Sequence, residues 1–239
     1  MPGTFDWDSN NTNAFIAIVY TAVGFAAYWF IAESEQIKKK YFNNGNDEQN
    51  QVRYVVFQKL VGVLFLGIIP AVYFLSSTEY SLAKLGMQLG DYTHSLMYIA
   101  GMAVLILIMN YFASSNPKNL ERYPQMRLKE WNKKRIAADA FSWAAYLLAY
   151  EFLFRGVLLF VCFDAFGFWP AVAINLSLYS ATHIPKGPGE TFGAVVFGLL
   201  LCYITVSTQS LATAFFAHLT MALSNEFFSV HHHPEMKFV

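Results

Sequence analysis

The sequence contains little charge. Of its 239 residues, 13% are aspartate, glutamate, lysine or arginine, whereas a typical soluble domain carries about 25%. Sixteen basic and sixteen acidic residues balance to a formal net charge of zero. Such a sparse and balanced charge favours neither a nucleic acid nor any other strongly charged partner, and we expect no nucleic-acid partner.

Cysteine is also scarce. The two cysteines, Cys162 and Cys202, both lie in apolar runs, so we expect core thiols rather than a disulfide or a metal-binding pair. Lysine and arginine are missing from the first thirteen positions, where Asp6 and Asp8 are the charged residues. A cleaved signal peptide begins with a basic region, so we expect none here.

Apolar residues, in contrast, are abundant, with 56% hydrophobic and 18% aromatic residues. Seven segments approach the length of about 20 residues that a helix needs to cross a bilayer. They cover residues 14–32, 59–75, 96–112, 140–163, 168–183, 192–207 and 211–230. Because only a helix satisfies every backbone group within one span, we predict an all-α, polytopic membrane helix bundle. No internal repeat is evident, so we expect a single membrane domain over residues 1–239.

The basic residues indicate how this bundle is oriented. If the N-terminus is outside, the inner loops hold Lys38, Lys39, Lys40, Arg53, Lys118, Arg122, Arg127, Lys129, Lys133, Lys134, Arg135, Lys186 and Lys237, and the outer loops hold Lys84 alone. We therefore expect seven spans with the C-terminus in the cytosol, in the plasma (inner) membrane if the source is bacterial. Lys59, near the inner end of its span, is expected to extend its amine toward the interface.

Three of the predicted spans carry ionisable side chains. Glu151 and Arg155 are four residues apart in the fourth span, His183 ends the fifth, and His218 lies in the seventh. A charge at the bilayer centre costs about 2.5–3.5 kcal/mol on insertion scales, so such residues usually mark a site. At 1.5 Å per residue the carboxylate and the two imidazoles lie at depths that agree to within about two helical turns. We expect one shared polar site, although Glu151 and Arg155 could also be a purely structural ion pair.

These groups suit the hydrolysis of a peptide bond, which needs an activated water, a base and donors for the oxyanion. A glutamate with an imidazole can deprotonate water, and a second imidazole can stabilise the developing negative charge. Glu151, His183 and His218 could instead bind zinc, which lowers the pKa of water to about 7. The residue types do not choose between these chemistries, and the HExxH pattern of zinc peptidases does not occur in the sequence.

Three short motifs carry a resemblance to one family. The sequence from Tyr150 to Gly156 resembles the EExxxR motif of the CPBP family, which includes type II CAAX prenyl proteases and bacteriocin-processing, Abi-type membrane proteases. Residues 179–183 resemble its FxxxH motif, and residues 208–211 with His218 resemble the approach to its HxxxN or HxxxD motif. Order and spacing agree over residues 138–230, which we expect to form a four-helix catalytic core.

The resemblance implies a multi-pass intramembrane endopeptidase that cleaves a membrane-associated protein or peptide. Carried over residue by residue, it implies that Glu151 and His183 activate the water. It further implies that His218 donates to the oxyanion and that Arg155 orients the glutamate.

Two positions depart from the family pattern. Tyr150 occupies the place of the first glutamate, and Ala222 occupies the place of the asparagine or aspartate four residues after His218. Asn225, seven residues after His218 and so on nearly the same helix face, is our candidate for the missing amide; Glu226 is also close. The opposing hypothesis is a catalytically inactive CPBP-like membrane scaffold or immunity factor. A small transporter is a weaker third, because carboxylates and histidines in spans also form proton relays.

Overall fold

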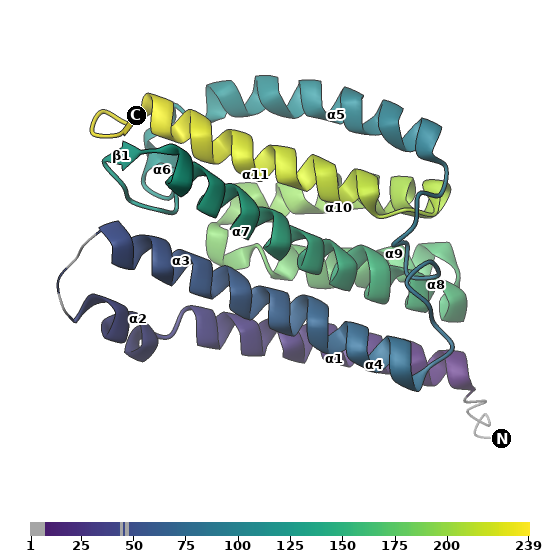
Figure 1. Ribbon diagram of the computed structural model, residues 1–239. Coiled ribbons are helices and arrows are strands. Elements are labelled where there is room, and N and C mark those ends of the chain that lie inside the picture. Colours follow the sequence, from purple (N-terminus) through teal and green to yellow (C-terminus); the bar gives the residue numbers. More distant parts are fainter. Residues whose placement is uncertain (1–7, 44, 46–47) are drawn as a thin grey trace.

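The fold of this chain is a bundle of long helices, seen here in a computed structural model that describes residues 8–43, 45 and 48–239 (Figure 1). The predicted absence of a signal peptide rests partly on Asp6, which lies outside the described residues. The α-helices are α1 (Ser9–Ala32), α2 (Glu35–Phe42), α3 (Glu48–Gly62), α4 (Ile69–Ser77), α5 (Tyr92–Ala113), α6 (Pro117–Leu120), α7 (Lys133–Glu151), α8 (Leu159–Phe166), α9 (Phe168–Ala181), α10 (Pro188–Thr208) and α11 (Ala212–His232). Wider π-helical turns, η1 (Val63–Ile68) and η2 (Phe152–Leu158), join α3 to α4 and α7 to α8. A 3-10 turn, η3 (Ile184–Lys186), follows α9, and two short parallel strands, β1 (Glu130–Trp131) and β2 (Lys237–Phe238), pair near the C-terminus.

The predicted all-α membrane bundle is confirmed. Among the residues that the structure describes, five stretches of helix are long and apolar enough to cross a membrane: Ser9–Phe42, Glu48–Ser77, Tyr92–Ala113, Lys133–Phe166 and Pro188–Thr208. The other two predicted spans correspond to α9 and α11. With 14 residues, α9 is about 21 Å long, short of a hydrocarbon core of about 30 Å. The 21-residue α11 is long enough, but polar side chains such as His218 and Ser224 lower its hydropathy. The count of seven spans therefore stays a prediction.

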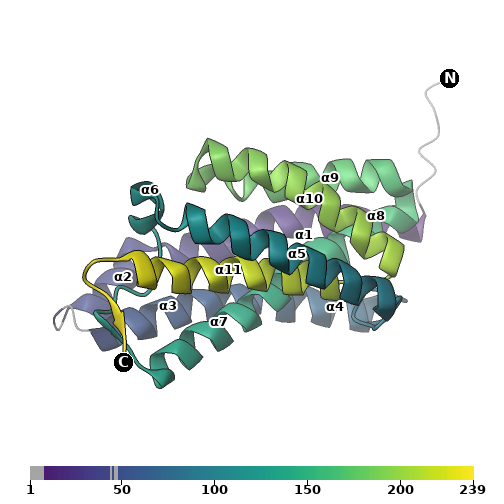
Figure 2. The ribbon, with the colours of Figure 1, turned by 90° about the horizontal axis from the view of Figure 1, so that it is seen from above.

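The helical rods run roughly side by side and alternate in direction (Figure 1). The elements α2, α6, β1 and the C-terminus gather at one end, and the first turn of α1 lies at the other. Most of the predicted inner-loop lysines and arginines therefore belong to one end of the bundle. Figure 2 shows α11 alongside α5, and these two helices are in extensive contact.

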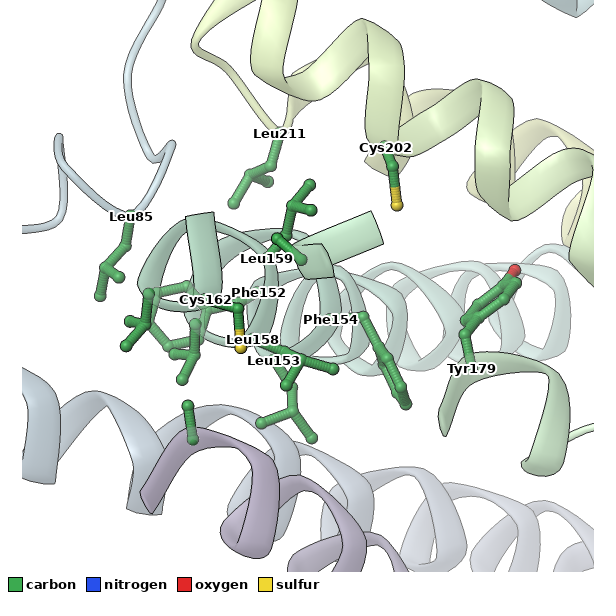
Figure 3. Packing of buried hydrophobic residues seen from close by; sticks show 14 of the residues in the cluster. Leu85, Phe152, Leu153, Phe154, Leu158, Leu159, Cys162, Tyr179, Cys202 and Leu211 are labelled. Atoms are coloured by element: carbon green, nitrogen blue, oxygen red, sulfur yellow. The ribbon is translucent and has the colours of Figure 1, made fainter. Parts of the chain in front are cut away.

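The centre of the bundle is the rod formed by α7, η2 and α8. Every residue from 149 to 162 is buried, and this run includes all of η2. A helix that is buried on all sides must be surrounded by other elements; here α1, α9 and α10 surround it. Figure 3 shows the side chains of this rod pointing in several directions, with Leu85 and Leu211 on one side and Tyr179 on another. The charged pair predicted at 151 and 155 is therefore at the core of the molecule.

Candidate active site

Glu151 and Arg155 lie at the junction of α7 and the π-helical turns of η2. Arg155 Nη1 is 3.1 Å from Glu151 Oε2 in an ion pair and donates to Oε1 at 3.5 Å, and neither side chain is exposed to solvent. The irregular turns are supported from α9, where the amide of Asn175 donates to the carbonyl oxygen of Phe154 at 2.6 Å. π-Helical turns occur frequently at functional sites.

The same carboxylate contacts α11 through His218. The distance between His218 Nδ1 and Glu151 Oε1 is 2.7 Å. Because an ionised carboxylate only accepts hydrogen bonds, Nδ1 carries the proton and Nε2 presents its lone pair. The His218 side chain is 15% exposed, whereas that of Glu151 is fully buried. The arrangement is a carboxylate–imidazole dyad with its basic nitrogen turned away from the carboxylate.

The second imidazole, His183, comes directly after the last turn of α9. Its Nδ1 donates to the carbonyl oxygen of Tyr179 at 2.9 Å, so its Nε2 is also the unprotonated nitrogen. The His183 ring lies 4.8 Å from that of Tyr179, which contacts Tyr150, the residue packed against His218. The site thus combines one carboxylate with two imidazoles that are both held in the Nδ1–H tautomer.

Aromatic rings form the wall between these groups. The ring of Tyr150 packs edge-on against His218, with 5.6 Å between ring centroids, and is 5.9 Å from the ring of Tyr179. The guanidinium carbon of Arg155 lies 4.0 Å from the centroid of the Tyr179 ring, a cation–π contact. Tyr179 therefore contacts both halves of the site, the ion pair through its ring and His183 through its carbonyl group.

The structure brings some predicted site residues together and not others. Glu151, Arg155 and His218 are in direct contact, and His183 joins them through Tyr179. Among the interactions of the described residues, none links the half-buried Asn225 to Glu151 or to either histidine.

Glu226 belongs to a different environment. It accepts hydrogen bonds from the indole of Trp143 and the backbone of Gln125.

The placement of Asn225 on the His218 face rested on helical periodicity alone, which does not settle whether a side chain seven residues away reaches the same partners.

Sequence reasoning gave no role to Tyr179 and Thr182, which the structure places beside His183. The hydroxyl of Thr182 donates to the Tyr179 carbonyl at 2.7 Å and lies 3.2 Å from His183 Nδ1. The four-residue spacing from Tyr179 to His183 was a usable signal, because it places the carbonyl of one residue one helical turn from the ring of the other.

The site does not have the donor arrangement of a zinc centre. His218 and Arg155 both donate to Oε1 of Glu151, at 2.7 and 3.5 Å, and Nδ1 of His183 is bonded to a carbonyl group. Within the described part of the chain, no three histidine, cysteine, aspartate or glutamate side chains are grouped as metal ligands would be. As they are placed, these side chains are not gathered around one zinc position.

A second buried polar cluster lies toward the end of the bundle that holds α2 and α6. Lys59 Nζ is 3.3 Å from Asp139 Oδ1, with side-chain exposures of 5% and 0%. The amine also lies 3.9 Å from the centroid of the Trp143 ring. The prediction that Lys59 extends toward the interface is wrong, since Asp139, 80 residues away in the sequence, pairs with it inside the bundle.

These features define a class: a helical integral membrane protein with a carboxylate–imidazole dyad at a buried glutamate and a second imidazole linked to it through Tyr179. Residues 132–224, from the start of α7 to the second half of α11, match the family described as Type II CAAX prenyl endopeptidase Rce1-like. The match covers fewer than half of the 239 residues, and over this segment it supports the CPBP-family membership that the three motifs predict. Neither a curated protein nor a solved structure matches the chain.

Proposed function

We propose that this protein is an intramembrane peptidase that hydrolyses a peptide bond in a membrane-associated protein or peptide. The observation that carries the proposal is the hydrogen bond of 2.7 Å between the buried Glu151 and the partly exposed His218. A buried carboxylate holds the imidazole in one tautomer and stabilises the cation that forms when the imidazole accepts a proton. The family match to a prenyl endopeptidase supports the same reaction class.

In the proposed reaction, His218 Nε2 takes a proton from a water molecule, and the resulting hydroxide attacks the carbonyl carbon of the scissile bond. The tetrahedral oxyanion then collapses, the C–N bond breaks, and the proton on His218 passes to the leaving amine. This differs from the role implied by the resemblance, because Glu151 accepts from His218 and thereby favours a base there over an oxyanion donor. His183 Nε2 holds the attacking water from the other side.

Donors for the oxyanion are available beside the ion pair. Nε and Nη2 of Arg155 are buried and have no hydrogen-bond partner among the described residues. Buried donors without partners are costly in a folded protein, and a developing negative charge would satisfy them. Asn225 stays a prediction for the same role.

The second candidate function is a non-catalytic membrane scaffold or immunity factor. One observation favours it: Tyr150, at the position of the first motif glutamate, is a phenol that hydrogen-bonds to Thr182 instead of a carboxylate. In this alternative, Glu151, Arg155 and His218 only hold α7, η2 and α11 together.

The two candidates differ in their response to loss of either imidazole. The protein, reconstituted in liposomes, would be given a quenched-fluorescence peptide with a farnesylated CAAX tail and the same peptide without the prenyl group. General-base catalysis contributes about 10²–10⁴-fold. We therefore expect His218→Ala and His183→Ala each to lower kcat/KM at least about 100-fold on the peptide that is cleaved.

The matched control is His94→Ala, because His94 is an exposed histidine bonded to Asp91 outside the site. Full activity in both site variants would overturn the proposal. A folded wild-type protein that cleaves neither peptide would favour the non-catalytic alternative.

We also propose seven spans with the N-terminus outside and the C-terminus in the cytosol. The grouping of basic residues at one end of the bundle supports this orientation. Both native cysteines are buried, so single cysteines introduced at the surface report topology. On intact cells, a membrane-impermeant maleimide should label Lys84→Cys and should reach Lys40→Cys only after permeabilisation. The reverse pattern would invert the orientation.

A further inference from the structure

A chain of hydroxyl groups connects Tyr150 to His183 across two helices. The Tyr150 hydroxyl is 2.9 Å from Thr182 Oγ1. Thr182 donates its own proton to the Tyr179 carbonyl at 2.7 Å, so Tyr150 is the donor to Thr182. Thr182 Oγ1 also lies 3.2 Å from His183 Nδ1, which makes the imidazole N–H a shared donor to the hydroxyl and the carbonyl.

Tyr179, whose carbonyl oxygen accepts from both Thr182 and His183, has little freedom to move. Tyr179 is 1% exposed, and its ring packs against the guanidinium of Arg155. On the opposite side α10 presents Gly198, where a Cβ atom would lie 3.0 Å from the Tyr179 ring. A fixed Tyr179 carbonyl gives Thr182 and His183 a fixed acceptor.

His183 lies two residues after the end of α9 at Ala181, where its backbone N–H donates to the Ser180 carbonyl at 3.0 Å and the 3-10 turn η3 follows. The regular α-helical pattern has therefore ended at His183. The two hydroxyl groups link this segment after α9 to the buried rod of α7. The linkage decides where His183 Nε2 points. That this direction matters for catalysis rests on the proposed function.

We infer that Tyr150 and Thr182 are positioning residues that fix the orientation and the Nδ1–H tautomer of His183. Tyr150 thus orients the second imidazole through a neutral hydroxyl pair, while Glu151 orients the first through a carboxylate. The two imidazoles then differ in character. His218 is hydrogen-bonded to a carboxylate, whereas the hydrogen-bond partners of His183 are the Tyr179 carbonyl and the Thr182 hydroxyl.

The simpler alternative is that Tyr150 is an ordinary core aromatic whose hydroxyl happens to be satisfied. Under that alternative, removing the hydroxyl lowers stability without lowering kcat selectively. The neighbouring Tyr146 provides a matched control. It lies one turn earlier on α7, its ring centroid is 5.9 Å from that of Tyr150, and no hydrogen bond joins it to His183 or Thr182 among the described residues.

The experiment compares Tyr150→Phe, Thr182→Val and their combination with Tyr146→Phe, using the peptide that the wild-type protein cleaves. Hydrogen-bond partners that orient metal-bound histidines typically contribute about 10–100-fold to activity, and we take the same scale for the partners of His183. We expect each single variant to lower kcat by about that factor with KM little changed. The kcat of the double variant should be no lower than that of the less active single variant, because both substitutions break the same hydrogen-bonded chain. Thr182→Ser, which keeps the hydroxyl, should restore kcat.

Several outcomes would overturn the inference. These are a kcat for Tyr150→Phe equal to that of Tyr146→Phe, multiplicative losses in the double variant, or no rescue by serine. Thermal unfolding in detergent, measured for every variant, separates a loss of kcat from a loss of folded protein. If the wild-type protein shows no cleavage, the proposed function fails first. If it cleaves and the Tyr150 and Thr182 variants are unaffected, only the positioning role fails.

Discussion

Glu151→Gln is expected to remove cleavage and to destabilise the protein at the same time. Glutamine has nearly the same shape but carries no charge, so His218 loses the group that stabilises its protonated form. Arg155 becomes a fully buried cation without a counter-ion. Removing one partner of a buried ion pair typically costs about 3–5 kcal/mol. The measurements are kcat/KM on the cleaved peptide, expected to fall about 10²–10⁴-fold, and thermal unfolding in detergent.

The double variant Glu151→Gln/Arg155→Met separates the two effects. Without the guanidinium, no buried charge remains unpaired, so much of the lost stability should return. Cleavage should not return, because the dyad is still missing. If activity recovers together with stability, Glu151 and Arg155 serve only to pack α7 against η2, and the proposed role of Glu151 in catalysis is wrong.

Lys59→Met is expected to have the second large effect, this time on stability alone. The substitution leaves Asp139 with no neighbouring cation inside the bundle, and its Oδ2 already has no hydrogen-bond partner among the described residues. We expect a loss of about 3–5 kcal/mol in the free energy of unfolding. Peptide cleavage, measured below the unfolding temperature, should stay within about twofold of wild type, because no contact links Lys59 to Glu151 or the histidines among the described residues.

A compensating variant and a surface control complete this test. Lys59→Met/Asp139→Leu replaces the whole pair with apolar side chains, and such replacements are often neutral or stabilising. Lys84→Met removes an exposed lysine and should change the unfolding temperature little. Equal unfolding temperatures for Lys59→Met and Lys84→Met would show that the 3.3 Å contact contributes nothing to stability.

Most of the helices could be predicted from the sequence because long apolar runs have few alternatives in a bilayer. The contact between Glu151 and Arg155 was also predictable, since residues four apart share a helix face. The pairing of Glu151 with His218 was not, because 67 residues separate them and depth alone does not say which imidazole the carboxylate meets. Lys59 was misassigned for the same reason, as its partner is distant in the sequence.

The π-helical turns show another limit of sequence reasoning. A regular helix closes each hydrogen bond on the fourth residue ahead, whereas π-helical turns close on the fifth. A helical wheel drawn for residues 133–166 therefore loses its register after Phe152, where η2 begins. Asp164, whose carboxylate accepts from the Tyr80 hydroxyl at 2.9 Å, lies downstream of that shift. Angular projections of this rod should be drawn in two separate pieces, and substitutions chosen from a single projection would address the wrong side of α8.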